Sequence, residues 1–257
     1  MSDAGRSVVM VENPDGAGSF AIVCDHASNR IPAEYQSFEF ANDALQTHIA
    51  WDPGALPVAR HLSATLDAPL LWPDVSRLVI DCNRAADASS LIVTESEGRP
   101  VPANVGLGEG ERSRRLEFIH APYHAAIDAC IKRRAASGRA TTLIAIHSFT
   151  PVYLGRSRPW QIGIVFGEDR RMADLLIGEL KSDPSLNVGI NEPYSPADQV
   201  YYTVERHAGP RELPAAMVEI RNDEIGDDAG QRRWADRLAK ILVRAEPSRV
   251  GARHAAA

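Results

Sequence analysis

Short apolar runs alternate along the chain with longer stretches in which apolar and polar residues recur at helical spacing. A short run of apolar residues without a polar face predicts a strand that is buried on both sides of a sheet. The clearest runs are FAIVCD at residues 20–25, LVIDC at 78–82, TLIAI at 142–146, IGIVFG at 162–167 and AMVEI at 216–220.

Helical periodicity occupies residues 54–66, 111–137, 169–182 and 229–245. Pro122 lies inside the second of these segments and is expected to start or bend the helix there. Strands that alternate with helices of this length predict an α/β fold, in which a mixed, mostly parallel sheet lies between two layers of helices.

The chain shows no internal repeat and no convincing linker, and its 257 residues suit one domain. We therefore expect a single domain over residues 1–257, with a core of about 20–245 and a frayed tail at 247–257. Segment 95–111 is rich in glycine and proline, which predicts a surface loop.

Charge and composition exclude several classes of protein. The net charge is −6 and the isoelectric point is near 5.8, which argues against nucleic-acid binding. No apolar run approaches the ~20 residues of a membrane span, and no secretory signal is visible. The three cysteines are widely separated in sequence, which is typical of reduced, buried thiols in a cytoplasmic protein.

Polar residues with catalytic potential lie at the ends of the predicted strands. His26 follows the first strand, Asn83 and Arg84 the second and His147 the third, and Glu219 lies within the last. Ligands of open α/β sheets bind beyond the carboxyl ends of the strands. Zinc hydrolases need imidazole and carboxylate ligands and a separate carboxylate that takes the proton of water. A histidine that simply begins a loop is an equally good interpretation of this pattern at His147.

Three segments resemble those of zinc carboxypeptidases: IDCNR at 80–84, AIHSF at 145–149 and VEIRND at 218–223. More of the chain, from residue 21 to 242, resembles the N-formylglutamate amidohydrolases. The segments that carry this resemblance are DHASNRIP at 25–32, AWDPGA at 50–55, SRLVIDCNR at 76–84, PYH at 122–124 and RHAG at 206–209. The resemblance implies a fold similar to that of zinc exopeptidases.

The resemblance implies one zinc ion held by His26 and His147, with a third ligand still to be assigned. In carboxypeptidases a glutamate stands three residues after the first histidine, where this chain has Asn29. A carboxylate is a better zinc ligand than an amide, so Asp52 is the favoured third ligand. The alternative for Asp52 is a capping role at the start of the helix that follows it.

The resemblance also implies a general base, and two further residues are candidates for the oxyanion from their positions in the chain. Glu219 is the expected general base, and the alternative for it is a structural pair with Arg221. Arg77 and His207, the latter on an expected loop, are candidate donors to the oxyanion, although Arg77 has a structural alternative.

For the substrate, Asn83 and Arg84 are expected to bind the α-carboxylate, since a guanidinium can grip a carboxylate through two hydrogen bonds. His124 is expected near the substrate, His120 in a structural role. Arg156 is a candidate for the side-chain carboxylate.

The expected reaction is hydrolysis of N-formyl-L-glutamate to formate and glutamate. One alternative is hydrolysis of another N-acyl amino acid or a small peptide, and another is a non-catalytic module that binds metal or amino acids. The expected partner is a small molecule, with no nucleic acid and no membrane, and the oligomeric state is left open.

Overall fold

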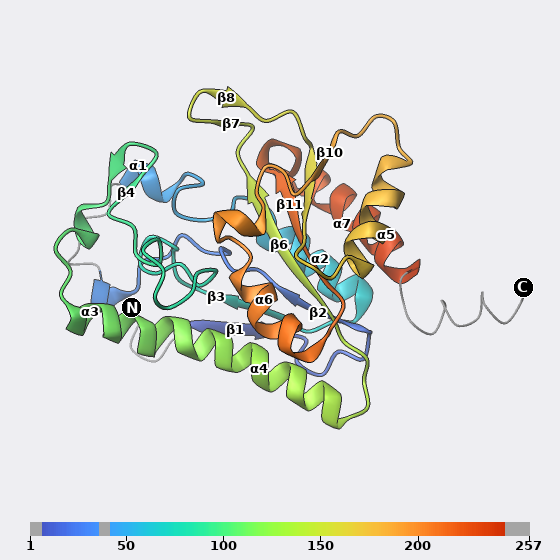
Figure 1. Ribbon diagram of the computed structural model, residues 1–257, viewed down its shortest axis with the longest axis horizontal. Coiled ribbons are helices and arrows are strands. Elements are labelled where there is room, and N and C mark those ends of the chain that lie inside the picture. Colours follow the sequence, from blue (N-terminus) through green and yellow to red (C-terminus); the bar gives the residue numbers. More distant parts are fainter. Residues whose placement is uncertain (1–6, 36–41, 245–257) are drawn as a thin grey trace, which may run out of the picture.

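The computed structural model describes residues 7–35 and 42–244, so the tail expected at 247–257 lies outside the described residues. A seven-stranded sheet runs through the molecule (Figure 1). In spatial order its strands are β1 (Val9–Glu12), β3 (Leu70–Pro73), β2 (Phe20–Val23), β6 (Thr142–Phe149), β11 (Ala215–Arg221), β9 (Ile162–Val165) and β10 (Val188–Ile190).

The centre of the sheet is parallel. Strands β3, β2, β6 and β11 run in one direction, whereas β1 is antiparallel to β3 and β9 is antiparallel to β11. The carboxyl ends of the four parallel strands therefore meet at one edge of the sheet. The expected mixed, mostly parallel sheet is confirmed.

Helices cover both faces of the sheet, which gives the expected three layers (Figure 1). Ile144 and Ile146 of β6 pack toward α2, α5 and α7, and Leu143 and Ala145 pack toward α4 and α6. The helices are α1 (Asn42–Leu45), α2 (Ala55–Leu66), α3 (Glu109–Arg115), α4 (Ala121–Ala136), α5 (Arg171–Lys181), α6 (Tyr202–Ala208) and α7 (Asp228–Arg244). Because residues along a strand alternate between faces, His147 belongs to the face covered by α4 and α6.

The prediction of a strand at 78–82 is wrong. This segment is a buried loop, and the strand beside β2 is β3. Its backbone bonds to side chains and to another loop, as the Val79 carbonyl accepts from Arg115 and the Asp81 amide donates to the Leu91 carbonyl. The segment is as apolar as a strand because it is equally buried.

Strands β1, β3 and β10 were not predicted. Their apolar runs are shorter than the segments FAIVCD and IGIVFG that predicted β2 and β9. The expected surface loop at 95–111 contains the hairpin of β4 (Glu95–Ser96) and β5 (Arg99–Pro100), and α3 begins within it. A second hairpin of β7 (Val152–Tyr153) and β8 (Arg156–Ser157) follows β6 (Figure 1).

The long helix expected at 111–137 is continuous but changes its winding before Pro122. A π-helical segment, Leu116–His120, joins α3 to α4, and Pro122 lies in the first turn of α4. Proline has no amide hydrogen to donate to the preceding turn, and the π-helical winding lies directly before it. The helix does not start at Pro122 as one alternative expected, because helical structure continues from Glu109 through Ala136.

Gly54 fixes the start of α2. Its φ angle is +82°, a conformation that glycine adopts without strain, and a Cβ atom there would lie 2.4 Å from the Ile225 carbonyl oxygen. The glycine therefore permits both the left-handed turn and the close approach of the segment that follows β11. It thereby places the loop of Asp52 against the sheet edge.

We predict that Gly54→Ala lowers the free energy of unfolding by about 1–3 kcal/mol, because it combines backbone strain with a clash. Gly138→Ala is the matched control, since Gly138 also has a positive φ of +67° but has no atom within 4 Å of the added Cβ. Urea unfolding of both variants checks this prediction. Equal losses would show that the contact with Ile225 contributes nothing.

Candidate metal centre and active site

Adjacent parallel strands bring the candidate catalytic residues to one edge of the sheet. His26 follows β2, His147 lies in β6 and Glu219 lies in β11, directly opposite His147 in the strand register. Asp52 comes from the loop before α2. The backbone amide of Asp52 donates to the His26 carbonyl at 2.8 Å. The structure thus brings together residues that are far apart in the sequence.

Two aspartates orient the imidazole rings. The Nε2 atom of His26 lies 2.7 Å from Oδ1 of Asp81, and Nε2 of His147 lies 2.9 Å from Oδ2 of Asp25. A carboxylate only accepts hydrogen bonds, so each Nε2 carries a proton, and Nδ1 is the nitrogen of each ring that is left to bind a metal ion. This arrangement of carboxylate and imidazole is typical of metal-ligating histidines.

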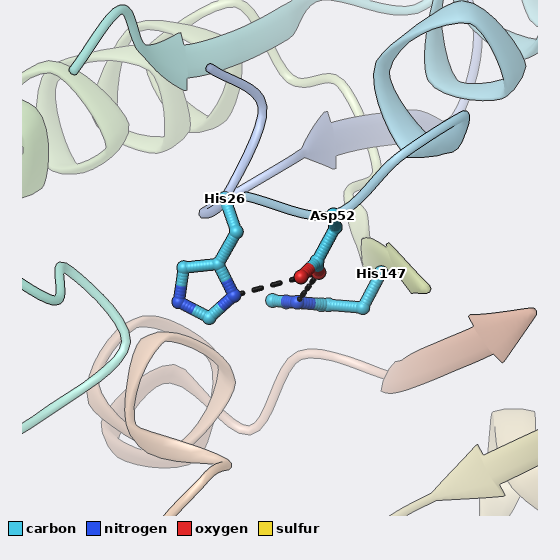
Figure 2. A group of neighbouring side chains, drawn as sticks. All are labelled: His26, Asp52 and His147. Carbon is cyan, nitrogen blue, oxygen red and sulfur yellow. Dashed lines mark hydrogen bonds and ion pairs between the residues drawn. The ribbon is translucent and has the colours of Figure 1, made fainter. Parts of the chain in front are cut away.

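The two Nδ1 atoms and the Asp52 carboxylate face one another (Figure 2). One oxygen of Asp52 lies 2.9 Å from Nδ1 of His147 and 3.4 Å from Nδ1 of His26, which makes no hydrogen bond. One ligand atom from each residue lies within 4.8 Å of the others. Two imidazole nitrogens and a carboxylate oxygen at this separation favour a cation between them, so the donor set fits a metal ion.

Carboxylates dominate the electrostatics of this cluster. Burial alone would raise the pKa of the Asp52 carboxyl, but His26 and His147 outweigh burial and hold this pKa below its ordinary value. Burial would lower the pKa of His147, yet Asp25 and Asp52 raise it well above its ordinary value. The centre of the cluster therefore favours a positive charge.

The structure favours Asp52 over Asn29 at the third position. The Asn29 amide donates to the Leu45 carbonyl at 2.8 Å, whereas Asp52 lies between the two histidines. The helix-capping alternative for Asp52 is not seen, because the N-cap of α2 is Gly54 and has no side-chain cap.

Glu219 is a buried carboxylate without a hydrogen bond at Oε2. Burial raises its pKa to about 7. The alternative pairing with Arg221 is not observed, because the Arg221 guanidinium bonds instead to Asp223. An unpaired carboxylate one strand away from His147 is placed to take a proton from a group in the cavity.

A cavity of about 300 Å³ opens above these residues. Its walls include the metal-site residues and Glu219, the arginines Arg77 and Arg84, and the aromatic rings of Phe149, Tyr153 and Tyr194. Arg77 donates to Asp81 at 2.7 Å and lies 3.7 Å from Asp52. Arg84 donates through Nε to Ser90 and through Nη1 to the Asn83 carbonyl.

The sequence model of the N-formylglutamate amidohydrolase family matches residues 19–226. The chain belongs to this family. Solved structures with a similar fold include two that cover nearly all of this chain. One is a gene product of Agrobacterium tumefaciens with 40% identity and a TM-score of 0.92, over 96% of this chain and 98% of that one. The other is an N-formylglutamate amidohydrolase from Ralstonia eutropha with 18% identity and a TM-score of 0.74, over 95% and 99% of the two chains. None of the curated proteins that were compared matches this chain.

Asn83 of this family member lines the cavity, but its amide is occupied by protein groups. Oδ1 accepts from the Thr203 backbone amide at 3.0 Å, and Nδ2 donates to the Val200 carbonyl and lies 3.9 Å from the sulfur of Met217. Arg84 is therefore the stronger candidate for a contact with a substrate carboxylate.

Besides Asn29, three predicted site residues do not line this cavity: Arg156, His124 and His207. Arg156 is exposed on β8. His207 lies in α6 and not on the expected loop, and it bonds to His124 of α4 behind the cavity wall. The i, i+4 spacing of His120 and His124 was visible in the sequence, but the helix that would pack against them was not.

Sequence reasoning missed Asp25, Asp81, Tyr194 and His48. Asp25 and Asp81 hold the metal-site rings, and a carboxylate inside an apolar run was the signal that a cationic or donor partner was required. Tyr194 and His48 line the cavity from segments without a strong pattern, where the Tyr194 hydroxyl accepts from Arg158 at 3.0 Å and His48 bonds to Glu97.

The histidine pair behind the cavity predicts an acid sensitivity. Burial lowers the pKa of His124 to about 3 and that of His207 to about 4. The unfolded chain binds these protons near pH 6.5 and the folded chain only at lower pH. The free energy of unfolding should therefore fall, by roughly 1 kcal/mol per pH unit for each ring, as the pH drops from 6.5 toward 4.

Urea unfolding between pH 4 and pH 8 measures this slope. His124→Gln should make it shallower, while His61→Gln, at a partly exposed position of α2, should leave it unchanged. A slope that His124→Gln does not alter would contradict the buried, neutral state of that ring.

Proposed function

We propose that this chain is a metal-dependent amidohydrolase that cleaves the amide of an N-acyl amino acid, with N-formyl-L-glutamate as the first candidate and formate and glutamate as the products. Family membership supports the reaction class. The observation that carries the proposal is the placement of the unpaired, buried Glu219 beside the group of His26, Asp52 and His147 in one cavity.

The metal would be held by Nδ1 of His26, Nδ1 of His147 and a carboxylate oxygen of Asp52. This set of nitrogen and oxygen ligands suits zinc and leaves a coordination position free. When bound, zinc supplies Lewis-acid chemistry, which polarises a carbonyl and makes water more acidic.

The residues around the metal position would carry out the proton transfers. Glu219 accepts the proton of the attacking water and then passes it to the nitrogen of the leaving amino acid. Its burial removes competing solvent and keeps its pKa near neutrality, which suits both halves of this task.

Arginines and a tyrosine would orient the substrate. Arg84 is the candidate for the α-carboxylate, since its Nε and Nη1 atoms are anchored by Ser90 and by the Asn83 carbonyl. Arg77 and Tyr194 are candidate donors to the developing oxyanion. Tyr194 accepts a hydrogen bond from Arg158 and so has its own hydroxyl proton to donate.

A second substrate class is favoured by the charge of the cavity mouth. Glu95 and Glu97 line it together with His48, and Arg77 is already bonded to Asp81. Carboxylates at the mouth disfavour the side chain of glutamate and favour a neutral or cationic one. N-formyl derivatives of glutamine and arginine are therefore the next candidates.

The proposal extends to the cellular location and the partner of the protein. We propose a cytoplasmic location, because Cys24, Cys82 and Cys130 are buried and unpaired. In residues 7–35 and 42–244, the structure contains no helix that is long and apolar enough to cross a membrane. We keep a small molecule as the proposed partner.

The assigned ligands predict the metal content. Purified protein should carry about one divalent ion per chain, and His147→Ala should lose it. Asp52→Ala should weaken the metal more than Asn29→Ala, because Asp52 offers a charged oxygen beside both imidazoles. Elemental analysis after competition with a chelator measures the order of the two variants, and the reverse order would return the third ligand to Asn29.

The assigned base predicts a selective loss of turnover. Glu219→Gln preserves shape but cannot accept a proton, so kcat should fall by about 10²–10⁴-fold while metal content stays unchanged. Release of free amine from N-formylglutamate, N-formylglutamine and N-formylarginine provides the assay. If metal-loaded parent binds these compounds and releases no formate, the chain is a binding module and not an enzyme.

A further inference from the structure

Three buried histidines lie behind the cavity wall, outside the metal site. His120 is the last residue of the π-helical segment and His124 lies one turn further along, in α4, while His207 faces them from α6. Their exposed fractions are 5%, 2% and 2%. An apolar side chain would fill such positions at a lower desolvation cost, so the imidazoles need a reason to be there.

The hydrogen bonds of these rings end on the loop that carries Arg84. Nε2 of His120 lies 2.9 Å from the Arg84 carbonyl oxygen, and Nε2 of His124 lies 3.0 Å from the Cys82 carbonyl oxygen. Nδ1 of His124 lies 2.9 Å from Nε2 of His207. Two consecutive turns of one helix thus hold two carbonyl groups of a three-residue segment.

Elementary hydrogen-bond chemistry fixes the tautomer of each ring. A carbonyl oxygen only accepts, so His120 and His124 carry their protons on Nε2. Burial lowers the pKa of His124 to about 3, so its ring is neutral and Nδ1 is an acceptor. His207 must then donate to it from Nε2. This chain of donors has one direction and ends at the Cys82 carbonyl.

Asn83, which lies between Cys82 and Arg84, is also held by hydrogen bonds to α6 and to the segment before it. The Asn83 amide accepts from the backbone of Thr203 at the start of α6 and donates to the Val200 carbonyl. Cys82 is therefore bonded to α4 and Arg84 to the end of the π-helical segment. Asn83 is bonded to Thr203 of α6 and to Val200 before that helix. The 82–84 segment is an irregular loop, so no strand ladder holds it in place.

We propose that His120 and His124 are positioning residues that hold the 82–84 segment so that Arg84 meets the substrate carboxylate, and that His207 fixes the ring of His124. The proposal rests on the proposed function, because it assumes that Arg84 binds a carboxylate. It adds a role for three residues that do not line the cavity.

A comparison of two substrates separates positioning from general stability. The substrates are N-formylglutamate and the same compound with its α-carboxylate converted to a carboxamide, and the readout is kcat/KM for each. His124→Leu should lower kcat/KM on the carboxylate substrate about tenfold and leave the carboxamide substrate nearly unchanged, as the loss of one hydrogen bond from a positioned ion contact implies. Arg84→Ala should give the same selective loss.

A conservative variant and a control complete this test. His124→Gln can still donate from its amide nitrogen to the Cys82 carbonyl, so it should recover most of the discrimination. His61→Gln on α2 should leave both substrates unchanged. If His124→Leu does not fold, His120→Leu removes only the donor to the Arg84 carbonyl and takes its place. Equal losses on both substrates, or no recovery with His124→Gln, would overturn the proposal.

A measurement without turnover distinguishes this proposal from the proposed function. Nitrogen NMR of labelled histidines at pH 7 should show His120, His124 and His207 as neutral rings protonated on Nε2, each assigned through its own glutamine variant. A charged ring, or a proton on Nδ1 of His120 or His124, would overturn the positioning role even in an active enzyme. Parent protein that hydrolyses neither substrate but shows these tautomers would overturn the proposed function alone.

Discussion

The geometry of the candidate site depends on two hydrogen bonds, which His26 donates to Asp81 and His147 donates to Asp25. Both lie on the side of each ring that faces away from Asp52. They place a proton on Nε2 of each ring and turn both Nδ1 atoms toward Asp52. Each aspartate is held in turn, Asp81 by Arg77 and Asp25 by Tyr123 and Thr203. A buried imidazole without such a partner could rotate or change tautomer, and three ligand atoms would then no longer face one point.

The sheet supplies the rest of this rigidity. His147 and Glu219 are direct neighbours in the register of β6 and β11, and both strands are buried along nearly their whole length. Backbone hydrogen bonds on both sides of β11 fix the distance between the candidate base and the metal position. The proposed substrate contacts, in contrast, come from Arg77, Arg84 and Tyr194, which lie on loops.

Sequence pattern predicted the parts of the fold that repeat along many residues. The long helices, the central strands and the meeting of His26, His147 and Glu219 at one edge follow from periodicity and from the geometry of parallel sheets. The prediction failed at residues 78–82, because a buried loop is as apolar as a buried strand. Periodicity does not show which backbone groups a segment bonds to. Arg156 and His207 were misplaced for a related reason. The position of a side chain near a cavity depends on tertiary packing, and a single sequence reports packing only through its apolar pattern.

The irregular loop that replaces the expected strand has a consequence for how such a protein can change over time. The groups proposed for catalysis lie on or beside the sheet, where any insertion would shift a register shared by several strands. The walls that would select the substrate are loops, which tolerate insertions and exchanges far better. Descendants of one ancestral chain could therefore keep one reaction and acquire different substrates, by altering loop residues while the strands stay unchanged.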